Sequence, residues 1–184
     1  MKRPAVFFDR DGTLIDERGY LGDPSKIRFY PSAVPALRRL SKAGYRVVIV
    51  SNQSGVARGY FSLAEMKAVH ARFIELLRKD GVRLDGAYFC PHAPDGGCRC
   101  RKPRPGMPRQ AARELGIDLR RSFVVGDQLR DIAMARAVGA RGVLVLTGGG
   151  RAARRRAMPL AAKVTSNAAT AAAWILSIPV PAIK

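Results

Sequence analysis

Acidic residues, cysteine and long apolar runs are all scarce in this sequence of 184 residues, and each shortage excludes a class of protein. The three cysteines cannot pair into a complete disulfide framework, which argues against a small secreted scaffold and for a reducing compartment. No apolar run approaches the roughly 20 residues that a membrane-spanning helix needs. The basic, then apolar N-terminus is interrupted by Asp9 and Asp11 too early to be a secretory signal. We therefore expect a cytoplasmic protein with no membrane partner.

The shortage of acidic residues leaves 33 Lys and Arg against 14 Asp and Glu, a formal net charge of +19. Charge of this size suits a nucleic acid, an anionic membrane surface or an anionic small molecule as partner, and it also fits arginines that only cover the surface. The densest basic stretch, RAARRR at 151–156, contains no aromatic side chains that would stack on bases. We therefore rank an anionic substrate above a nucleic acid. A basic nucleic-acid-binding protein or a polynucleotide 3′-phosphatase is kept as the distant alternative.

Short apolar runs alternate with helical stretches along the chain. Strands are expected at 5–8, 46–50, 86–90, 122–126 and 142–146, and helices at 32–43, 62–80, 106–115, 129–138 and 166–177. Apolar strands separated by helices predict a parallel sheet covered on both faces, the doubly wound, Rossmann-like α/β fold. No linker or repeat divides the chain, so we expect residues 1–184 to form one domain and a monomer. The run LTGGGRAARRR at 146–156 lacks the spacing of a phosphate-binding loop and predicts a flexible exit from the last strand.

Polar side chains follow each of the first four strands, at the sheet edge where ligands bind in such folds. The segments are DRDGT after the first strand, SNQSG after the second, CRCRKP after the third and GDQLRD after the fourth. They bring Asp9, Asp11, Asp127 and Asp131 towards one place. Carboxylates that converge from separate segments predict a site for a hard cation, best suited to Mg²⁺.

The same strand ends carry the groups that phosphoryl transfer requires. A carboxylate beside Mg²⁺, here Asp9, can attack phosphorus and form an aspartyl-phosphate. Ser51 and Lys102 would hydrogen-bond and neutralise the phosphoryl oxygens. Asp11 would protonate the leaving oxygen and later deprotonate the attacking water. The residues therefore indicate a phosphatase.

Four segments resemble the four motifs of the haloacid-dehalogenase phosphatase superfamily, in order and over nearly the whole chain: FFDRDGTL, Ser51, Lys102 and GDQLRD. The resemblance implies that Asp9 is the nucleophile and Asp11 the general acid and base. It also implies that Asp9, the backbone carbonyl of Asp11 and Asp127 hold Mg²⁺, while the serine and the lysine stabilise the phosphoryl group. Asp131 is expected to orient these groups. The stretches between the motifs are largely used by the core, so we expect an open site without a separate cap domain.

All three cysteines and one of the two histidines fall within eleven residues, as Cys90, His92, Cys98 and Cys100. The pattern C-x-H-x5-C-x-C supplies three thiolates and an imidazole, a complete tetrahedral shell for a structural Zn²⁺. We expect this clasp to hold the next two residues, Arg101 and Lys102, in one geometry. The other histidine, His70, is expected to be an ordinary surface residue.

A zinc loop of this kind on this fold resembles two related families, the heptose-1,7-bisphosphate 7-phosphatases and the histidinol-phosphate phosphatases. Three segments match the heptose family, namely ERGY at 17–20, SNQSGVARGYF at 51–61 and CRKPRPGM at 100–107. The short stretch between Cys90 and Cys98 is more like the histidinol family, which stays as the alternative. Gln128 also stands where the heptose enzymes often have Lys.

The heptose resemblance implies a phosphorylated sugar substrate, used in making activated heptose for bacterial lipopolysaccharide. The substrate-binding residues that it implies are Glu17, Arg18, Gly19, Tyr20, Ser51, Asn52, Gln53, Ser54, Arg101 and Lys102. Arg101 would recognise the second phosphate, and Lys102 would contact the phosphate under attack. A bisphosphate carries about three to four negative charges, so a cationic mouth suits it.

Overall fold

Six parallel strands form one sheet in this computed structural model, which describes residues 2–16 and 19–179. The spatial order is β3-β2-β1-β4-β5-β6, so β1 lies inside the sheet between β2 and β4. The strands are β1 (Ala5–Phe8), β2 (Arg46–Asn52), β3 (Gly86–Cys90), β4 (Phe123–Gly126), β5 (Arg141–Val145) and β6 (Lys163–Thr165). The doubly wound parallel sheet expected from the alternation of strands and helices is confirmed.

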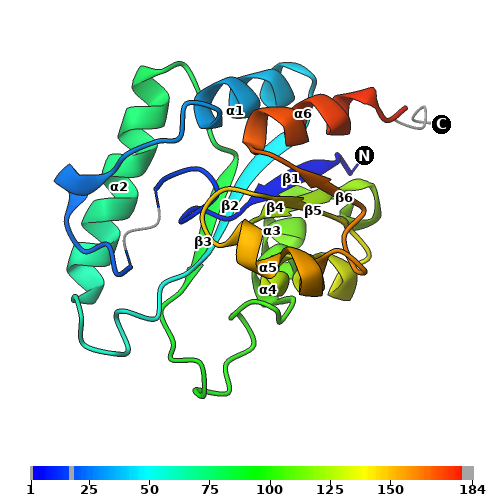
Figure 1. Cartoon of the computed structure of the whole chain (residues 1–184). Helices are drawn as coiled ribbons and strands as arrows, with labels where there is room; N and C mark the ends of the chain where they lie inside the picture. Colours follow the sequence, from blue (N-terminus) through cyan, green and yellow to red (C-terminus); the bar gives the residue numbers. More distant parts are fainter. Residues whose placement is uncertain (1, 17–18, 180–184) are drawn as a thin grey trace.

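Helices cover both faces of this sheet (Figure 1). The first face carries α1 (Ala33–Lys42), α2 (Leu63–Lys79) and α6 (Ala168–Ser177), and the second carries α3 (Gly106–Leu115), α4 (Leu129–Ala137) and α5 (Gly150–Ala157). Two short 3-10 turns, at Pro24–Lys26 and Leu119–Arg121, complete the described elements. Within the described residues, no helix combines the length and the apolar character needed to cross a membrane.

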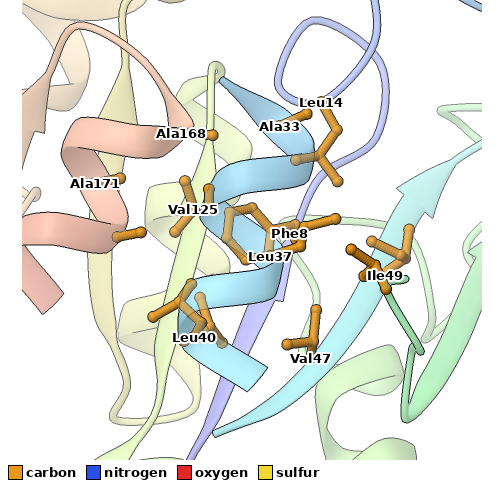
Figure 2. Close-up of a cluster of buried hydrophobic side chains, with 14 of the residues drawn as sticks. Phe8, Leu14, Ala33, Leu37, Leu40, Val47, Ile49, Val125, Ala168 and Ala171 are labelled. Carbon is orange, nitrogen blue, oxygen red and sulfur yellow. The ribbon is translucent and has the colours of Figure 1, made fainter. Parts of the chain in front are cut away.

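The central strand contributes side chains to both layers because successive residues of a strand point to opposite faces. Val6 and Phe8 are fully buried in the cluster beneath α1 and α6, while Ala5 and Phe7 are buried on the other side. Figure 2 shows Phe8 between Leu37 of α1 and the neighbouring strands. A strand that is buried on both faces cannot end in an unpaired charge without a large desolvation penalty. The Asp that follows β1 therefore needs partners.

The structure corrects the expectation of a flexible exit at 146–156. Residues 150–156 of this stretch belong to helix α5, and β5 is followed by a further short strand, β6, that the sequence analysis missed. Helix α5 forms because Ala157 is buried and Ala153 half-buried against Ile132 and Leu144, while its arginines face solvent. Arginine and alanine are both good helix formers, so the glycines at 148–150 lead into a helix instead of a flexible segment.

The expectation that His70 is an ordinary surface residue is wrong. Its ring is half-buried on α2, with its centroid 5.5 Å from that of Phe89 in β3 and 6.4 Å from that of Phe73. The 3.6-residue period of α2 turns this side chain towards the sheet beside the buried Val69 and Phe73. Burial, with the nearby positive charge of Arg10, lowers the pKa of His70 to about 4.

This buried histidine should make the fold sensitive to mild acid. The unfolded chain takes up a proton on His70 below its ordinary pKa of 6.5, whereas the native protein does so only near pH 4. Between pH 7 and pH 5 the free energy of unfolding should therefore fall by about 2 kcal/mol more in the natural protein than in His70→Gln. Urea unfolding of both proteins at the two pH values measures the difference. Equal losses in the two proteins would contradict the prediction.

Candidate active site

The carboxyl ends of three adjacent strands bring the predicted residues together. Asp9 directly follows β1, Ser51 lies near the end of β2 and Asp127 directly follows β4. Because these strands are parallel neighbours, their ends meet at the same edge of the sheet. Lys102 joins them from the loop after β3, at the far end of a segment that contains the cysteine cluster. Residues more than a hundred positions apart therefore form one site.

Lys102 is the centre of this site. Its side chain is fully buried, and Nζ lies 2.7 Å from Asp9 Oδ1 and 2.8 Å from Asp131 Oδ1. Nζ also donates a hydrogen bond of 3.0 Å to the Val50 carbonyl. The ammonium is thus surrounded by three oxygens, two of them from carboxylates. Burial alone would lower the pKa of Lys102, but the charges of Asp131 and Asp9 outweigh it and raise the pKa above the ordinary value.

Asp9 is held at a pKa of about 6, above its usual value, chiefly because it is buried. The charge of Lys102 works against this rise, while the neighbouring carboxylates of Asp131 and Asp11 add to it. Its Oδ1 also accepts a hydrogen bond of 2.8 Å from the backbone N–H of Arg10. One lysine therefore does not balance the negative charge gathered here.

The Asp127 carboxylate packs closely against a cradle of backbone formed around Gly12 and Gly148. Its Oδ2 accepts hydrogen bonds from the Gly149 N–H at 2.7 Å and from Gln128 Nε2 at 3.0 Å. A Cβ on Gly12 would lie 2.5 Å from the same oxygen, and a Cβ on Gly148 would lie 2.6 Å from it. Both glycines also have positive φ, of 80° and 49°. The close approach and the backbone conformation together require glycine at these two positions.

Three buried carboxylates are placed to share a cation. Asp9, Asp127 and Asp131 each offer an oxygen, and these oxygens all lie within 4.8 Å of one another. Burial raises the pKa values of Asp9 and Asp127, repulsion from Asp9 adds to the rise at Asp127, and repulsion from Asp131 and Asp11 adds to the rise at Asp9. A divalent cation would remove this repulsion, and all-oxygen ligands suit Mg²⁺. The donor set therefore fits the magnesium ion expected from the sequence.

The side chain of Asp11 turns away from this carboxylate group. Its Oδ2 accepts hydrogen bonds from Gln53 Nε2 at 2.7 Å and from Ser51 Oγ at 3.3 Å. The guanidinium of Arg10 covers its other oxygen, with Arg10 Nη2 3.0 Å from Oδ1. Asp11 thus lies beside the predicted phosphoryl-binding serine, where a group that exchanges protons with bound substrate is needed.

A pocket of about 580 Å³ opens above these groups. Nearly all of the predicted substrate residues that the structure describes line it: Gly19, Tyr20, Asn52, Gln53, Ser54, Arg101 and Lys102. Ser51 is buried beneath the pocket, where its hydroxyl accepts a hydrogen bond of 2.7 Å from Gln53 Nε2. Glu17 and Arg18 lie outside the described residues.

Two arginines in the pocket wall were missed by the sequence analysis. Arg58 lies within the segment SNQSGVARGYF and Arg130 within GDQLRD, and both line the pocket beside Arg101. The guanidinium of Arg58 lies 5.9 Å from the ring centroid of Tyr20, and the ring of Tyr20 packs on Tyr60 at 4.2 Å. The motifs contained both arginines, but only the folded loops show that they face the same space.

The cysteines and His92 gather as the spacing predicts. Cys90 Sγ lies 3.5 Å from both Cys98 Sγ and His92 Nδ1, and Cys100 Sγ lies 3.3 Å from His92 Nδ1. Ligands at the usual zinc distances in a tetrahedron are roughly 3.5–3.8 Å apart, so the four atoms nearly enclose a zinc-sized position. The three cysteines are free of disulfides. Burial raises the pKa of the Cys90 thiol to about 12, so a cation is needed for this sulfur to act as a thiolate.

Hydrogen bonds tie this cysteine cluster to the pocket. Arg101 Nη1 donates to the carbonyl of His92 at 3.2 Å. The side chain of Asn52 then accepts from the Lys102 N–H at 3.0 Å and donates to the Lys102 carbonyl at 3.2 Å. The two cations therefore stand between the cluster on one side and the end of β2 on the other.

Known proteins resemble this chain in sequence and in fold. Residues 99–171 match the HAD-hydrolase-like family. A relative from Pseudomonas aeruginosa, D-glycero-beta-D-manno-heptose-1,7-bisphosphate 7-phosphatase, is 40% identical over 96% of this chain and 99% of its own length. The relative of the same name from Yersinia pestis is 39% identical over 95% of this chain and 90% of its own. The crystal structure of D,D-heptose 1.7-bisphosphate phosphatase from B. bronchiseptica, complexed with magnesium and phosphate, is 36% identical, with a TM-score of 0.87 over 94% of this chain and 98% of that one.

The cradle around Asp127 gives a prediction about the metal site. Gly12→Ala should weaken Mg²⁺ binding at least about tenfold, because its Cβ would displace the Asp127 carboxylate. Gly116→Ala is the matched control, since Gly116 also has positive φ but nothing lies within 4 Å of the added Cβ. Both variants should lose about 1 kcal/mol of stability from backbone strain. Calorimetric Mg²⁺ titration measures the difference, and equal affinities in the two variants would contradict it.

Proposed function

The chain belongs to the family of D-glycero-β-D-manno-heptose-1,7-bisphosphate 7-phosphatases among the HAD-like hydrolases, and we propose on that premise how its pocket selects and cleaves the substrate. The protein is a phosphatase that hydrolyses the 7-phosphate of heptose 1,7-bisphosphate. The names of the relatives specify the β anomer, and we extend this preference to the present chain.

The observation that carries the substrate assignment is the distribution of positive charge in the pocket. Lys102 lies at the floor beside Asp9, while Arg58, Arg101 and Arg130 line the walls. A monophosphate would need only the floor. A bisphosphate brings a second phosphate with about two negative charges. One guanidinium group can donate two parallel hydrogen bonds to the oxygens of a phosphate. The wall arginines would hold the 1-phosphate while the 7-phosphate reaches Asp9.

Asp9, the backbone carbonyl of Asp11 and Asp127 would hold Mg²⁺, which when bound neutralises charge on the transferring phosphoryl group. An Asp9 oxygen attacks phosphorus, and the bond from phosphorus to the sugar oxygen breaks. The leaving oxygen takes the proton of Asp11 and departs as the sugar hydroxyl. Asp11, now ionised, takes a proton from water, and the hydroxide attacks the aspartyl-phosphate. Inorganic phosphate and free Asp9 result.

The neighbouring side chains support each step. Lys102 holds the Asp9 carboxylate through its 2.7 Å contact and limits the build-up of negative charge as the phosphoryl group arrives. The Ser51 hydroxyl would turn from Asp11 to a phosphoryl oxygen, since it makes only a 3.3 Å contact with that carboxylate. Asp131 would fix Lys102 in place, with its Oδ2 accepting the Gln128 N–H at 3.0 Å.

Cys90, His92, Cys98 and Cys100 would bind one structural Zn²⁺, since they offer four ligands and no open position. The ion would take no part in bond making. Its role would be to order a loop whose residues between the ligands are largely exposed, and so to place Arg101 and Lys102.

The substrate assignment is tested by comparing kcat/KM on β-heptose 1,7-bisphosphate, histidinol phosphate and sugar monophosphates, with Mg²⁺ present. We expect the bisphosphate to be preferred at least about a hundredfold, because only it uses the wall arginines, each charge-assisted contact contributing about 1.5–3 kcal/mol. Asp9→Asn should fold normally and turn over none of the substrates. Equal rates on the bisphosphate and on the monophosphates would refute the assignment, and a preference for histidinol phosphate would replace it with the related activity.

Zinc should matter to catalysis only through geometry. Cys98→Ser, or removal of zinc by a chelator, should lower kcat/KM at least about tenfold while Mg²⁺ still binds, because Arg101 and Lys102 lose their support. Asp95→Ala in the same loop, which removes an exposed side chain and no ligand, should keep full zinc content and activity. Metal analysis and steady-state kinetics measure both effects. Full activity in a zinc-free protein would rule out the placement role.

A further inference from the structure

The largest fully buried side chain of the described residues is that of Arg10, which is 1% exposed. A buried guanidinium is strongly unfavourable unless a carboxylate and hydrogen bonds compensate it. The steps given above assign no task to this residue. Its position in the sequence, between the nucleophile Asp9 and the acid–base residue Asp11, raises the question of what it does there.

Arg10 grips one carboxylate with two nitrogens. Its Nη2 lies 3.0 Å and its Nε 3.1 Å from Asp11 Oδ1, while Nε lies 3.2 Å from Oδ2. Nε therefore donates a forked hydrogen bond to both oxygens, and Nη2 adds an ionic contact with Oδ1 without a hydrogen bond of its own. Oδ2 also accepts hydrogen bonds from Gln53 Nε2 at 2.7 Å and from Ser51 Oγ at 3.3 Å. Donors on both sides of the carboxylate fix its orientation as well as its position.

The backbone of Arg10 is held by hydrogen bonds, which limits movement of its guanidinium relative to the Asp11 carboxylate. Its N–H donates to Asp9 Oδ1 at 2.8 Å, and its carbonyl accepts the N–H groups of Leu14 at 2.9 Å and Ile15 at 3.1 Å. The side chain thus starts from a fixed point in the turn. Because it is also packed on all sides, its guanidinium has little freedom to follow Asp11 if that carboxylate rotates.

We propose that Arg10 is a positioning residue that assigns different tasks to the two oxygens of Asp11. By holding the carboxylate through Nε, with Nη2 against Oδ1, it keeps Oδ2 beside Ser51 as the oxygen that gives the proton to the leaving group and later takes one from water. It also keeps the Asp11 carboxylate turned away from the cluster of Asp9, Asp127 and Asp131. The proposal rests on the acid–base role of Asp11 proposed above.

The leaving group of the substrate separates positioning from mere support of the fold. A sugar oxygen needs a proton as it leaves, whereas a nitrophenolate is stable without one. The test compares kcat/KM, which covers the steps up to loss of the leaving group, on 4-nitrophenyl phosphate and on two alkyl phosphates, the heptose bisphosphate and glycerol phosphate. Arg10→Met keeps the volume but loses the grip, and Arg10→Lys keeps the charge but loses the two-nitrogen contact.

In Arg10→Met we expect the rate on both alkyl phosphates to fall about a hundredfold and the rate on the aryl phosphate at most about fivefold, since well-placed acids contribute roughly 10²–10⁴. Arg10→Lys should lie between this variant and the natural protein. Arg46→Met is the matched control: it breaks another partly buried pair, with Nη1 2.6 Å from Asp85 Oδ1, and should leave the alkyl-to-aryl ratio unchanged. If Arg10→Met fails to fold, the alkyl-to-aryl ratio of kcat/KM measured in Arg10→Lys decides the question.

An alkyl-to-aryl ratio within about threefold of the natural value in a folded Arg10 variant would overturn the proposal and leave Arg10 as a structural residue. A fall on all three substrates alike would do the same. Failure of the substrate assignment is distinguishable, because it would show as low bisphosphate turnover in the natural protein. The ratio can then still be measured with glycerol phosphate.

Discussion

The buried ammonium of Lys102 is the interaction on which the rest of the site depends. It bonds to Asp9 after β1, to Asp131 in α4 and to the carbonyl of Val50 in β2, and so joins three elements at one point. Without it, two carboxylates would lie buried and uncompensated among fully apolar strands, at a cost of several kcal/mol. The position of β1 between β2 and β4 makes this convergence possible. The burial that stabilises the sheet and the charge that we propose binds a phosphoryl group thus depend on the same side chain.

A lysine at the centre of a sheet edge must arrive from a loop, and loops are ordinarily the least ordered part of such a fold. This chain places Lys102 two residues after the last cysteine of a four-ligand cluster and pairs its backbone with the side chain of Asn52. The cluster is anchored in turn at the buried Cys90, the last residue of β3. The loop that carries Lys102 is therefore fixed at two points, by the cysteine cluster at the end of β3 and by the hydrogen bonds from Asn52 of β2.

Much of the site was predictable because its residues follow strongly apolar strands. Asp9, Ser51 and Asp127 could be located from runs such as AVFF and FVVG, whose burial requires no knowledge of partners. Arg58, Arg130 and His70 could not, since their surroundings depend on how loops and helices pack after folding. The helix at Gly150–Ala157 was missed for the same reason. Its apolar side packs on Ile132 of α4 and Leu144 of β5, and these contacts exist only in the folded protein. Local sequence pattern predicts where the strands lie, whereas the surroundings of a side chain are set by tertiary packing.

Cys90 belongs at once to the second hydrophobic cluster and to the four-ligand group, and β3 lies at the edge of the sheet. A cation bound there adds its binding free energy to that of the folded strand, because the ligands come together only when β3 is paired. The stability of the outermost strand would then depend on the concentration of free metal as well as on packing. Availability of the ion in the cell would thus set how often this edge of the sheet opens.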